Sequence, residues 1–186
     1  ILHMSWEMIH EGSLELLDQG LESEQTDEMT ALIRQQPGVL AVHSLRTRRM
    51  GSFALADVHI HVSKLISVSE GHHIAHQVKD VLHQQYPEMR DVEVHDDTES
   101  DVEWAASEQL PSRSELLTSI QQKCNKLPAF QYVGRINLHY LNGAVHMEVY
   151  LKQGCSIRDG KALAALCGMI RPIQQVRLFL DAGVVK

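Results

Sequence analysis

Hydrophobic and polar residues alternate along ADVHIHV, residues 56–62 of the 186-residue chain. Alternation with a period of two predicts a strand that is buried on one face. Val58 and Ile60 would then point to the core, and His59 and His61 would point away from it. A single histidine on the open face of a strand is more often an ordinary surface residue than a metal ligand. The rest of the chain must separate these two interpretations.

The pattern changes to a helical period on both sides of this strand. Apolar residues recur three and four positions apart over residues 24–36 and again from Ser67 onward, and Pro37 and Pro87 end these two stretches. Strand patterns occupy the remaining segments, residues 39–48, 53–62 and 91–97. The predicted order in this half of the chain is therefore αββαβ.

The second half of the chain repeats that order. A helical stretch runs from Ser112 to Pro128, two strand patterns flank an Asn-Gly pair typical of a hairpin turn, and a second helical stretch runs from Ser156 to Pro172. We expect an α+β protein of two ferredoxin-like αββαβ lobes, with antiparallel sheets, the third strand beside the first, and both helices on one face. The expected divisions are a leading segment (1–22), a first lobe (23–97), a linker (98–111) and a second lobe (112–186).

Charge is distributed unevenly between the halves. Residues 1–97 carry 7 Lys and Arg against 16 Asp and Glu, whereas residues 98–186 carry 10 against 8. An acidic lobe repels nucleic acid and attracts cations. The chain has no apolar run of the ~18 residues that cross a bilayer, and it has neither a signal-peptide pattern nor a Cys-x-x-Cys pair. Its three cysteines suit a reducing compartment.

Histidine is concentrated in the acidic half, where 8 of the 12 lie between His43 and His95. Strands that carry His43, His59 and His95 are expected to share one sheet, and Asp97 follows two residues after the last of them. Imidazole nitrogen and carboxylate oxygen are ligands of zinc and similar divalent ions. His72 opens the second helix near the sheet edge and can join them. The later histidines of that helix, His76 and His83, are expected on a solvated face.

Four segments of the first half resemble the cytoplasmic C-terminal domain of cation diffusion facilitators, which are dimeric membrane antiporters that export zinc, iron or manganese in exchange for protons. The resemblance covers about residues 5–97 and rests on the Leu45-Arg46-Thr47-Arg48 signature, the following glycine, and four histidines at family spacing. Residues 5–21 resemble the end of the last transmembrane helix and its connector. The segments are GVLAVHSLRTRRMG, DVHIHV, SVSEGHHIAHQV and VEVHDD.

The resemblance implies a cytoplasmic metal site, in which the aspartate can bridge two ions at the dimer interface. Zn²⁺ is the ion expected first, with Fe²⁺ or Mn²⁺ as alternatives. Neither His61 nor Asp96 has a family counterpart as a ligand. Asp18 matches an acidic position at the membrane junction, where the family can place an interlocking salt bridge. The implied ligands are His43, His59, His72, His95 and Asp97.

The same resemblance implies partners and a location. We expect a homodimer, joined to the transmembrane domain of the same protein, on the cytoplasmic side of an inner or plasma membrane, without enzymatic activity and without nucleic acid. The transmembrane ligands are absent from these residues, so the exported ion is not specified by them. In the second lobe, Phe179 and Asp181 stand where the first has His95 and Asp97, which indicates a copy that lost its metal site.

The resemblance thus implies a regulatory, metal-sensing domain that binds zinc or a similar ion near the dimer interface and biases the conformation of the transporter. Two other functions compete with this expectation. A structural dimerisation module would carry these histidines as ordinary surface residues. A metal-dependent hydrolase would use His59 and His61 with Asp96 and Asp97, but it would need a shaped pocket and an open metal position for water. The sequence has neither a helix motif with a general base nor a glycine-rich substrate loop.

Overall fold

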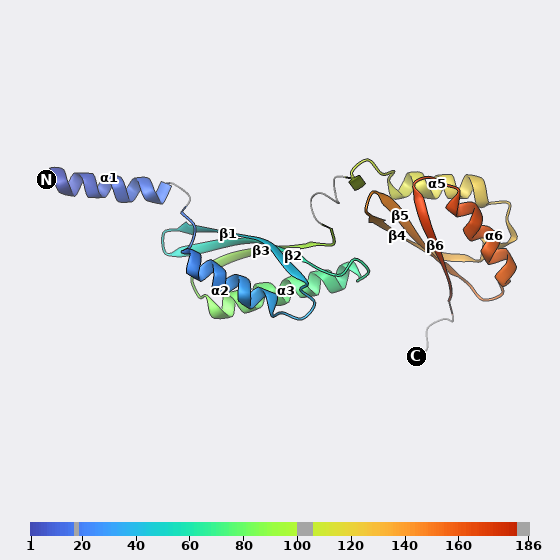
Figure 1. Cartoon of the computed structure of the whole chain (residues 1–186), viewed down its shortest axis with the longest axis horizontal. Coiled ribbons are helices and arrows are strands. Elements are labelled where there is room, and N and C mark those ends of the chain that lie inside the picture. The colour runs from blue at the N-terminus through green and yellow to red at the C-terminus, as the bar shows by residue number, and fades with distance from the viewer. Residues whose placement is uncertain (17–18, 100–105, 182–186) are drawn as a thin grey trace. The chain divides into compact units, whose positions relative to one another are not determined.

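The computed structural model describes residues 1–16, 19–99 and 106–181 (Figure 1). The chain divides into two compact units, residues 1–98 and 99–186, and each contains a three-stranded sheet. The α+β class with two αββαβ arrangements is therefore confirmed. Because the placement of one unit relative to the other is not defined, each is described by itself.

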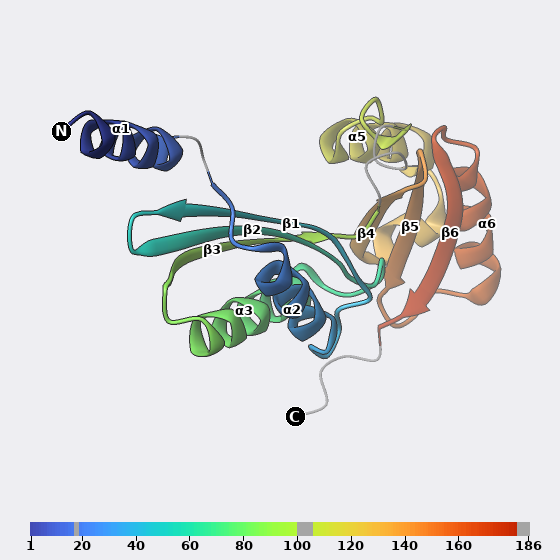
Figure 2. The ribbon, with the colours of Figure 1, turned by 60° about the vertical axis from the view of Figure 1, so that its left-hand side comes forward.

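The first unit has the predicted order of elements behind a leading helix. Helices α2 and α3 lie on the same face of the sheet, as expected (Figures 1 and 2). The elements are α1 (Leu2–Leu16), α2 (Ser23–Arg34), β1 (Ala41–Met50), β2 (Phe53–His61), α3 (Val68–Gln85) and β3 (Met89–Asp97).

The strand pairing of the first sheet differs from the expected one. Strands β1 and β2 form an antiparallel hairpin, but β3 pairs with β2, in parallel, so the order is β1-β2-β3. The prediction of an antiparallel sheet with the third strand beside the first was wrong. The physical reason is the crossover: α3 carries the chain back across one face of the sheet, so β3 starts at the same end as β2 and lies next to it.

The core of the first unit lies between the sheet and its two helices. On β2 the predicted alternation is confirmed, because Val58 and Ile60 are fully buried while Asp57 and His59 remain half-exposed on the other face. Helix α3 begins where Ser67 Oγ accepts the N–H of Glu70 at 3.1 Å. The helices contribute a continuous apolar face to this core through Met29, Ile33, Ile74, Val78 and Leu82.

The segment between α1 and α2 is attached to the first strand. The N–H of Arg49 donates to the carbonyl of Gln19 at 2.7 Å, and the N–H of Leu21 donates to Thr47 Oγ1 at 2.9 Å. Apolar side chains of α1, including Trp6, are exposed. No helix in the described part of the chain is long and apolar enough to cross a membrane. Asp18, the expected membrane-junction residue, lies outside the described residues.

The second unit repeats the mixed sheet of the first. Strands β4 and β5 are antiparallel, and β6 pairs with β5 in parallel. The predicted Asn-Gly hairpin is confirmed, because Asn142 and Gly143 have φ of 52° and 70°, the left-handed values that a two-residue turn of this kind requires. The elements are α5 (Arg113–Cys124), η1 (Pro128–Tyr132), β4 (Val133–Leu141), β5 (Ala144–Leu151), α6 (Ile157–Gly168) and β6 (Ile173–Leu180).

Part of the expected linker packs onto that hairpin turn. Glu99 and Ser107 are both buried, with exposed fractions of 6%. Glu99 Oε1 accepts the N–H of Asn142 at 2.6 Å, and Ser107 Oγ accepts the N–H of Gly143 at 3.1 Å. These bonds satisfy turn donors that the β-ladder leaves unpaired. The described ends of the segment therefore belong to the second unit.

Two of the three cysteines form part of the second core, where they pack as apolar residues. The Sγ atoms of Cys124 and Cys167 lie 3.6 Å apart between α5 and α6, and both residues are buried, whereas Cys155 is half-exposed. Burial, together with the adjacent Cys124, raises the pKa of Cys167 to about 12. A buried and protonated thiol does not react as a nucleophile.

Thiol reactivity should follow this burial. At about pH 8, near the ordinary thiol pKa, we expect one fast-reacting cysteine per folded chain and three after denaturation. The measurement is reaction with a chromogenic disulfide reagent, and Cys155→Ser is the control that should remove the fast phase. Two or three fast thiols in the folded chain would contradict the buried placement of the α5–α6 pair.

Candidate metal centre

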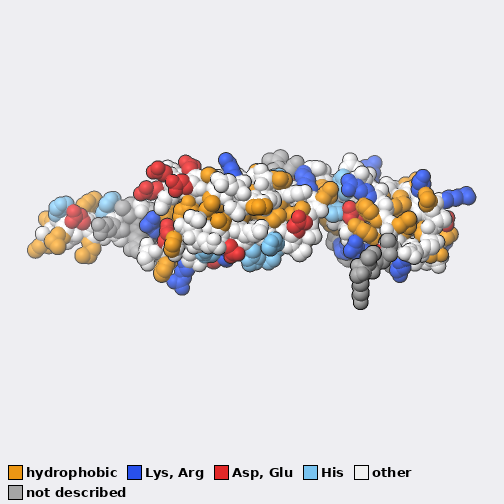
Figure 3. Space-filling model, turned by 90° about the horizontal axis from the view of Figure 1, so that it is seen from below, with side chains coloured by type: hydrophobic (Ala, Val, Ile, Leu, Met, Phe, Trp, Pro, Cys, Tyr) orange, Lys and Arg blue, Asp and Glu red, His pale blue; other side chains and the backbone are white. Residues whose placement is uncertain are grey.

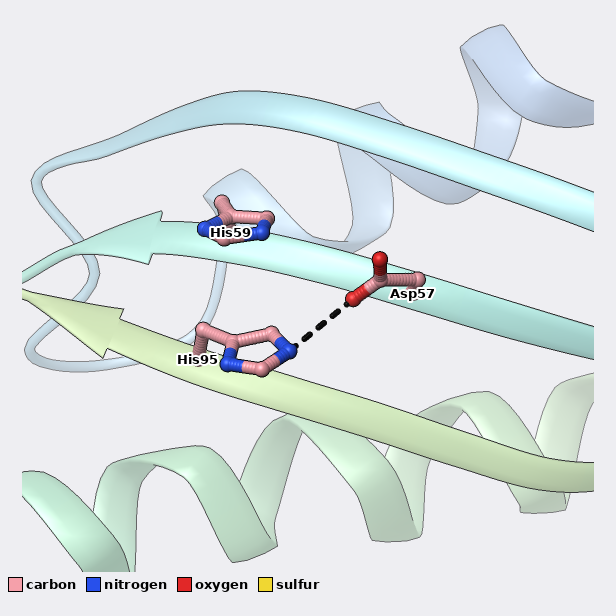
Figure 4. A group of neighbouring side chains, drawn as sticks. All are labelled: Asp57, His59 and His95. Carbon is pink, nitrogen blue, oxygen red and sulfur yellow. Dashed lines mark ion pairs between the residues drawn. The ribbon is translucent and has the colours of Figure 1, made fainter. Parts of the chain in front are cut away.

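Three potential ligands converge on the open face of the first sheet, opposite α2 and α3. Asp57 and His59 lie two residues apart on β2, and His95 lies opposite His59 on β3 in the parallel register. The rings of His59 and His95 stack with centroids 4.5 Å apart. One potential ligand atom from each residue lies within 4.8 Å of the others, and no further group of this kind occurs in the part of the chain that the structure describes. Figure 4 shows the three side chains side by side above the two strands.

An orphaned oxygen marks this cluster as polar and incompletely satisfied. Asp57 Oδ1 is shielded from solvent and accepts no well-aligned hydrogen bond; His95 Nε2 lies 3.1 Å away and forms an ion pair with it only when that imidazole is protonated. A buried carboxylate oxygen without a donor is costly. A divalent cation held by this oxygen and the neighbouring imidazole nitrogens would satisfy it, so the residues present fit a metal ion.

Asp97 supports the cluster from the side. Its Oδ2 lies 2.9 Å from His59 Nδ1. A carboxylate in that position selects the tautomer with hydrogen on Nδ1 and leaves Nε2 with a free lone pair for a metal. The structure thus brings together three of the five expected ligands, His59, His95 and Asp97. It adds Asp57, which sequence reasoning missed although its position two residues before His59 places it on the same face.

Part of the chain matches a known protein family. Residues 21–99 match the sequence profile of the family described as "Cation efflux protein, cytoplasmic domain". Residues 21–99 are thus similar to the cation efflux cytoplasmic domain, and we refer to them below as the efflux domain.

Relatives of this efflux domain are larger proteins. Metal tolerance protein C1 of Arabidopsis thaliana is 36% identical over 88 residues, which are 47% of this chain and 19% of that protein. The cation-efflux pump FieF of Yersinia pestis is 31% identical over 97 residues, 52% of this chain and 32% of that protein. The chain therefore spans at most a third of the length of these curated relatives.

Among solved structures, the efflux domain is similar to the MamM CTD. A nickel form of one MamM CTD variant has a TM-score of 0.41 at 20% identity, and the match covers 42% of this chain and all of that chain. A second MamM CTD structure, of residues 215–293 in its own numbering, has a TM-score of 0.39 at 23% identity and is covered over 94% of its length, 40% of this chain.

Of the two remaining expected ligands, His43 lies beside another histidine of the efflux domain. A β-bulge interrupts the β1–β2 register between Val42 and Ser44. The ring of His43 lies 4.9 Å from that of His61, centroid to centroid. Because a bulge redirects side chains, His43 is paired with His61 and is not part of the group around His59.

His72 lies apart from the sheet cluster as well. It is exposed at the start of α3, and its Nε2 lies 3.1 Å from Nε2 of His76, one helical turn later. Both line a shallow pocket between α3 and the β3 edge. His83, farther along, lies 3.0 Å from the Met89 carbonyl through its Nδ1.

The second unit has aromatic residues at the positions equivalent to the sheet cluster. Tyr150 and Phe179 stack with centroids 4.9 Å apart, in the register that His59 and His95 occupy in the efflux domain. Next to them, burial acts to raise the pKa of Glu148, but bonds from Tyr150, His139 and Asn137 together lower it. Tyr150 and Phe179 therefore stand in place of the two imidazoles. Among the described residues of the second unit, this face of the sheet lacks the pair of imidazole nitrogens that the first unit has.

Proposed function

We propose that residues 21–99 are the metal-sensing and dimerisation domain of a divalent-cation efflux transporter, which in the intact protein exchanges the cation for protons. The observation that carries the proposal is the cluster of Asp57, His59 and His95 with its orphaned carboxylate oxygen. The ion proposed first is Zn²⁺, because nitrogen and oxygen ligands in a group of three or four suit it. Fe²⁺ and Mn²⁺ remain the alternatives.

The charges around the cluster explain how binding would change the domain. Asp57, Glu93 and Asp97 all lie on the second and third strands with side chains toward the open face. In two copies that face each other, these carboxylates repel. A bound divalent cation would supply the positive charge that offsets this repulsion. The closer arrangement of the dimer then gains stability only to the extent that it holds the cation more tightly than the open one.

Transmission to the membrane part would pass through the connector. The bonds from Arg49 and Leu21 fix residues 19–21 to β1, so a movement of the sheet moves the connector with it. We propose that the chain continues through α1 toward a transmembrane domain of the same protein, and that the domain works as a homodimer on the cytoplasmic side of the membrane.

The test is a calorimetric titration of the 186-residue chain with Zn²⁺, followed by small-angle scattering with and without chelator. We expect saturable binding and a more compact dimer with zinc. Absence of binding, with scattering that a chelator does not change, would overturn the proposal and favour a metal-independent dimerisation module.

Zinc binding should weaken in acid. Protons compete with metal ions for imidazole nitrogen, and histidine in model peptides titrates near pH 6.5. We therefore expect the affinity for Zn²⁺ to fall steadily between about pH 7.5 and about pH 5.5 when the titration is repeated at several pH values. An affinity that is unchanged at the acid end would argue against ligation by histidine.

A further inference from the structure

Helix α3 carries a second pair of imidazoles that the sheet cluster does not use. His72 and His76 are one turn apart, which places them on the same side of the helix. Both are exposed, and their Nε2 atoms lie 3.1 Å apart. The two rings meet edge to face, with centroids 4.5 Å apart. The two Nε2 atoms are therefore direct neighbours on the outer surface of the helix.

That separation fits a chelate. Two metal–nitrogen bonds of about 2.1 Å put their nitrogens about 3.0 Å apart at a right angle and about 3.4 Å apart at the tetrahedral angle. The observed 3.1 Å lies between these values. Because both rings are exposed, small rotations can turn the two lone pairs to a common point. Histidines spaced in this way on one helix face are a recognised metal-binding arrangement.

The surroundings supply a wall. The pair lines a shallow pocket whose floor is the buried Ala75 and Val92. Lys79 is the cation of this pocket, but its Nζ lies 3.2 Å from Asp91 Oδ1, which offsets its charge. Figure 3 looks onto the helix-covered side of the first unit and shows histidine side chains gathered at its surface.

We propose that His72 and His76 form a second divalent-metal site, separate from the sheet cluster, with open positions for water. It binds borderline ions that prefer imidazole, in the order Cu²⁺ above Ni²⁺. His72 thus acts with its helical neighbour and not with His59 and His95. The site goes beyond the proposed sensing function and stands without it.

The experiment counts Ni²⁺ ions bound to the 186-residue chain by calorimetry and by elemental analysis after desalting. His72→Ala and His76→Ala should each weaken one class of site about tenfold or more, because the second imidazole binds intramolecularly only while the first is present. The matched control is His73→Ala, which removes an exposed imidazole at the adjacent position of the same helix. It should bind like the parent chain.

A further variant separates this site from the proposed function. In Asp57→Asn with His95→Gln the helix site should persist while the sheet site is lost. Persistence of both classes in that variant would contradict the sensing function but leave the helix pair intact. Unchanged stoichiometry and affinity in His76→Ala, or an equal loss in His73→Ala, would overturn the helix site.

Discussion

Replacing His95 by alanine is expected to weaken Zn²⁺ binding to the sheet cluster about 100-fold or more, because even groups that only orient a ligand contribute 10- to 100-fold. The change removes one of the three candidate ligands that converge on the open face and leaves Asp57 Oδ1 without its only ion-pair neighbour among the described residues. The measurement is a competitive titration against a zinc dye of known affinity. Circular dichroism should remain unchanged, since His95 is outside the core.

The matched control for this variant is His61→Ala. His61 lies on the same face of the same sheet, but its ring contacts His43. We expect its affinity for Zn²⁺ to remain within about threefold of the parent, as for a side chain outside the group of Asp57, His59 and His95. Equal losses in the two variants would indicate a general charge effect of the histidine-rich face. His43→Ala then decides whether the family-implied ligand takes part, for example across the dimer.

Replacing Ile60 by alanine should strongly lower the free energy of unfolding of the first unit and leave that of the second unit unchanged. Ile60 is fully buried on the central strand, between the sheet and the two helices. Truncation of such a side chain removes its transfer free energy and leaves a cavity, which lowers the free energy of unfolding by about 2–5 kcal/mol. Urea unfolding followed by amide hydrogen exchange measures the loss in each unit separately.

The control for the core variant is Leu65→Ala in the same unit. Leu65 is 56% exposed, so its truncation should change the free energy of unfolding by about 0.5 kcal/mol or less. A comparable loss of exchange protection in residues 113–180 of the Ile60→Ala chain would contradict the division into two independent cores. So would an Ile60→Ala effect no larger than that of the control.

The local sequence patterns were sufficient to predict the helices and strands of the two units and to predict which face of β2 is open. Alternation on that strand puts Val58 and Ile60 inside and His59 outside, and this depends only on the geometry of an extended backbone. The Asn142-Gly143 turn and the serine at the start of α3 likewise act within four residues of chain. Such signals are local, so the sequence alone determined them.

The strand order was decided only by the tertiary structure. His95 would have been placed next to His43 if β3 paired with β1, whereas the parallel crossover through α3 puts it beside His59 and Asp57. The path of a crossover depends on how a helix packs back onto a twisted sheet, which no local pattern encodes. Asp57 therefore became visible as a candidate ligand only in the folded chain.

His43 and His72 show the same difference, between what the sequence and what the tertiary structure determine, for the candidate metal site. The sequence by itself determined which residue types were available and that His43 and His72 could be ligands. A one-residue bulge turned His43 toward His61, and the helical rise placed His72 against His76. Metal binding requires atoms within a few ångströms of one point, and only strand register and helix packing set distances on that scale.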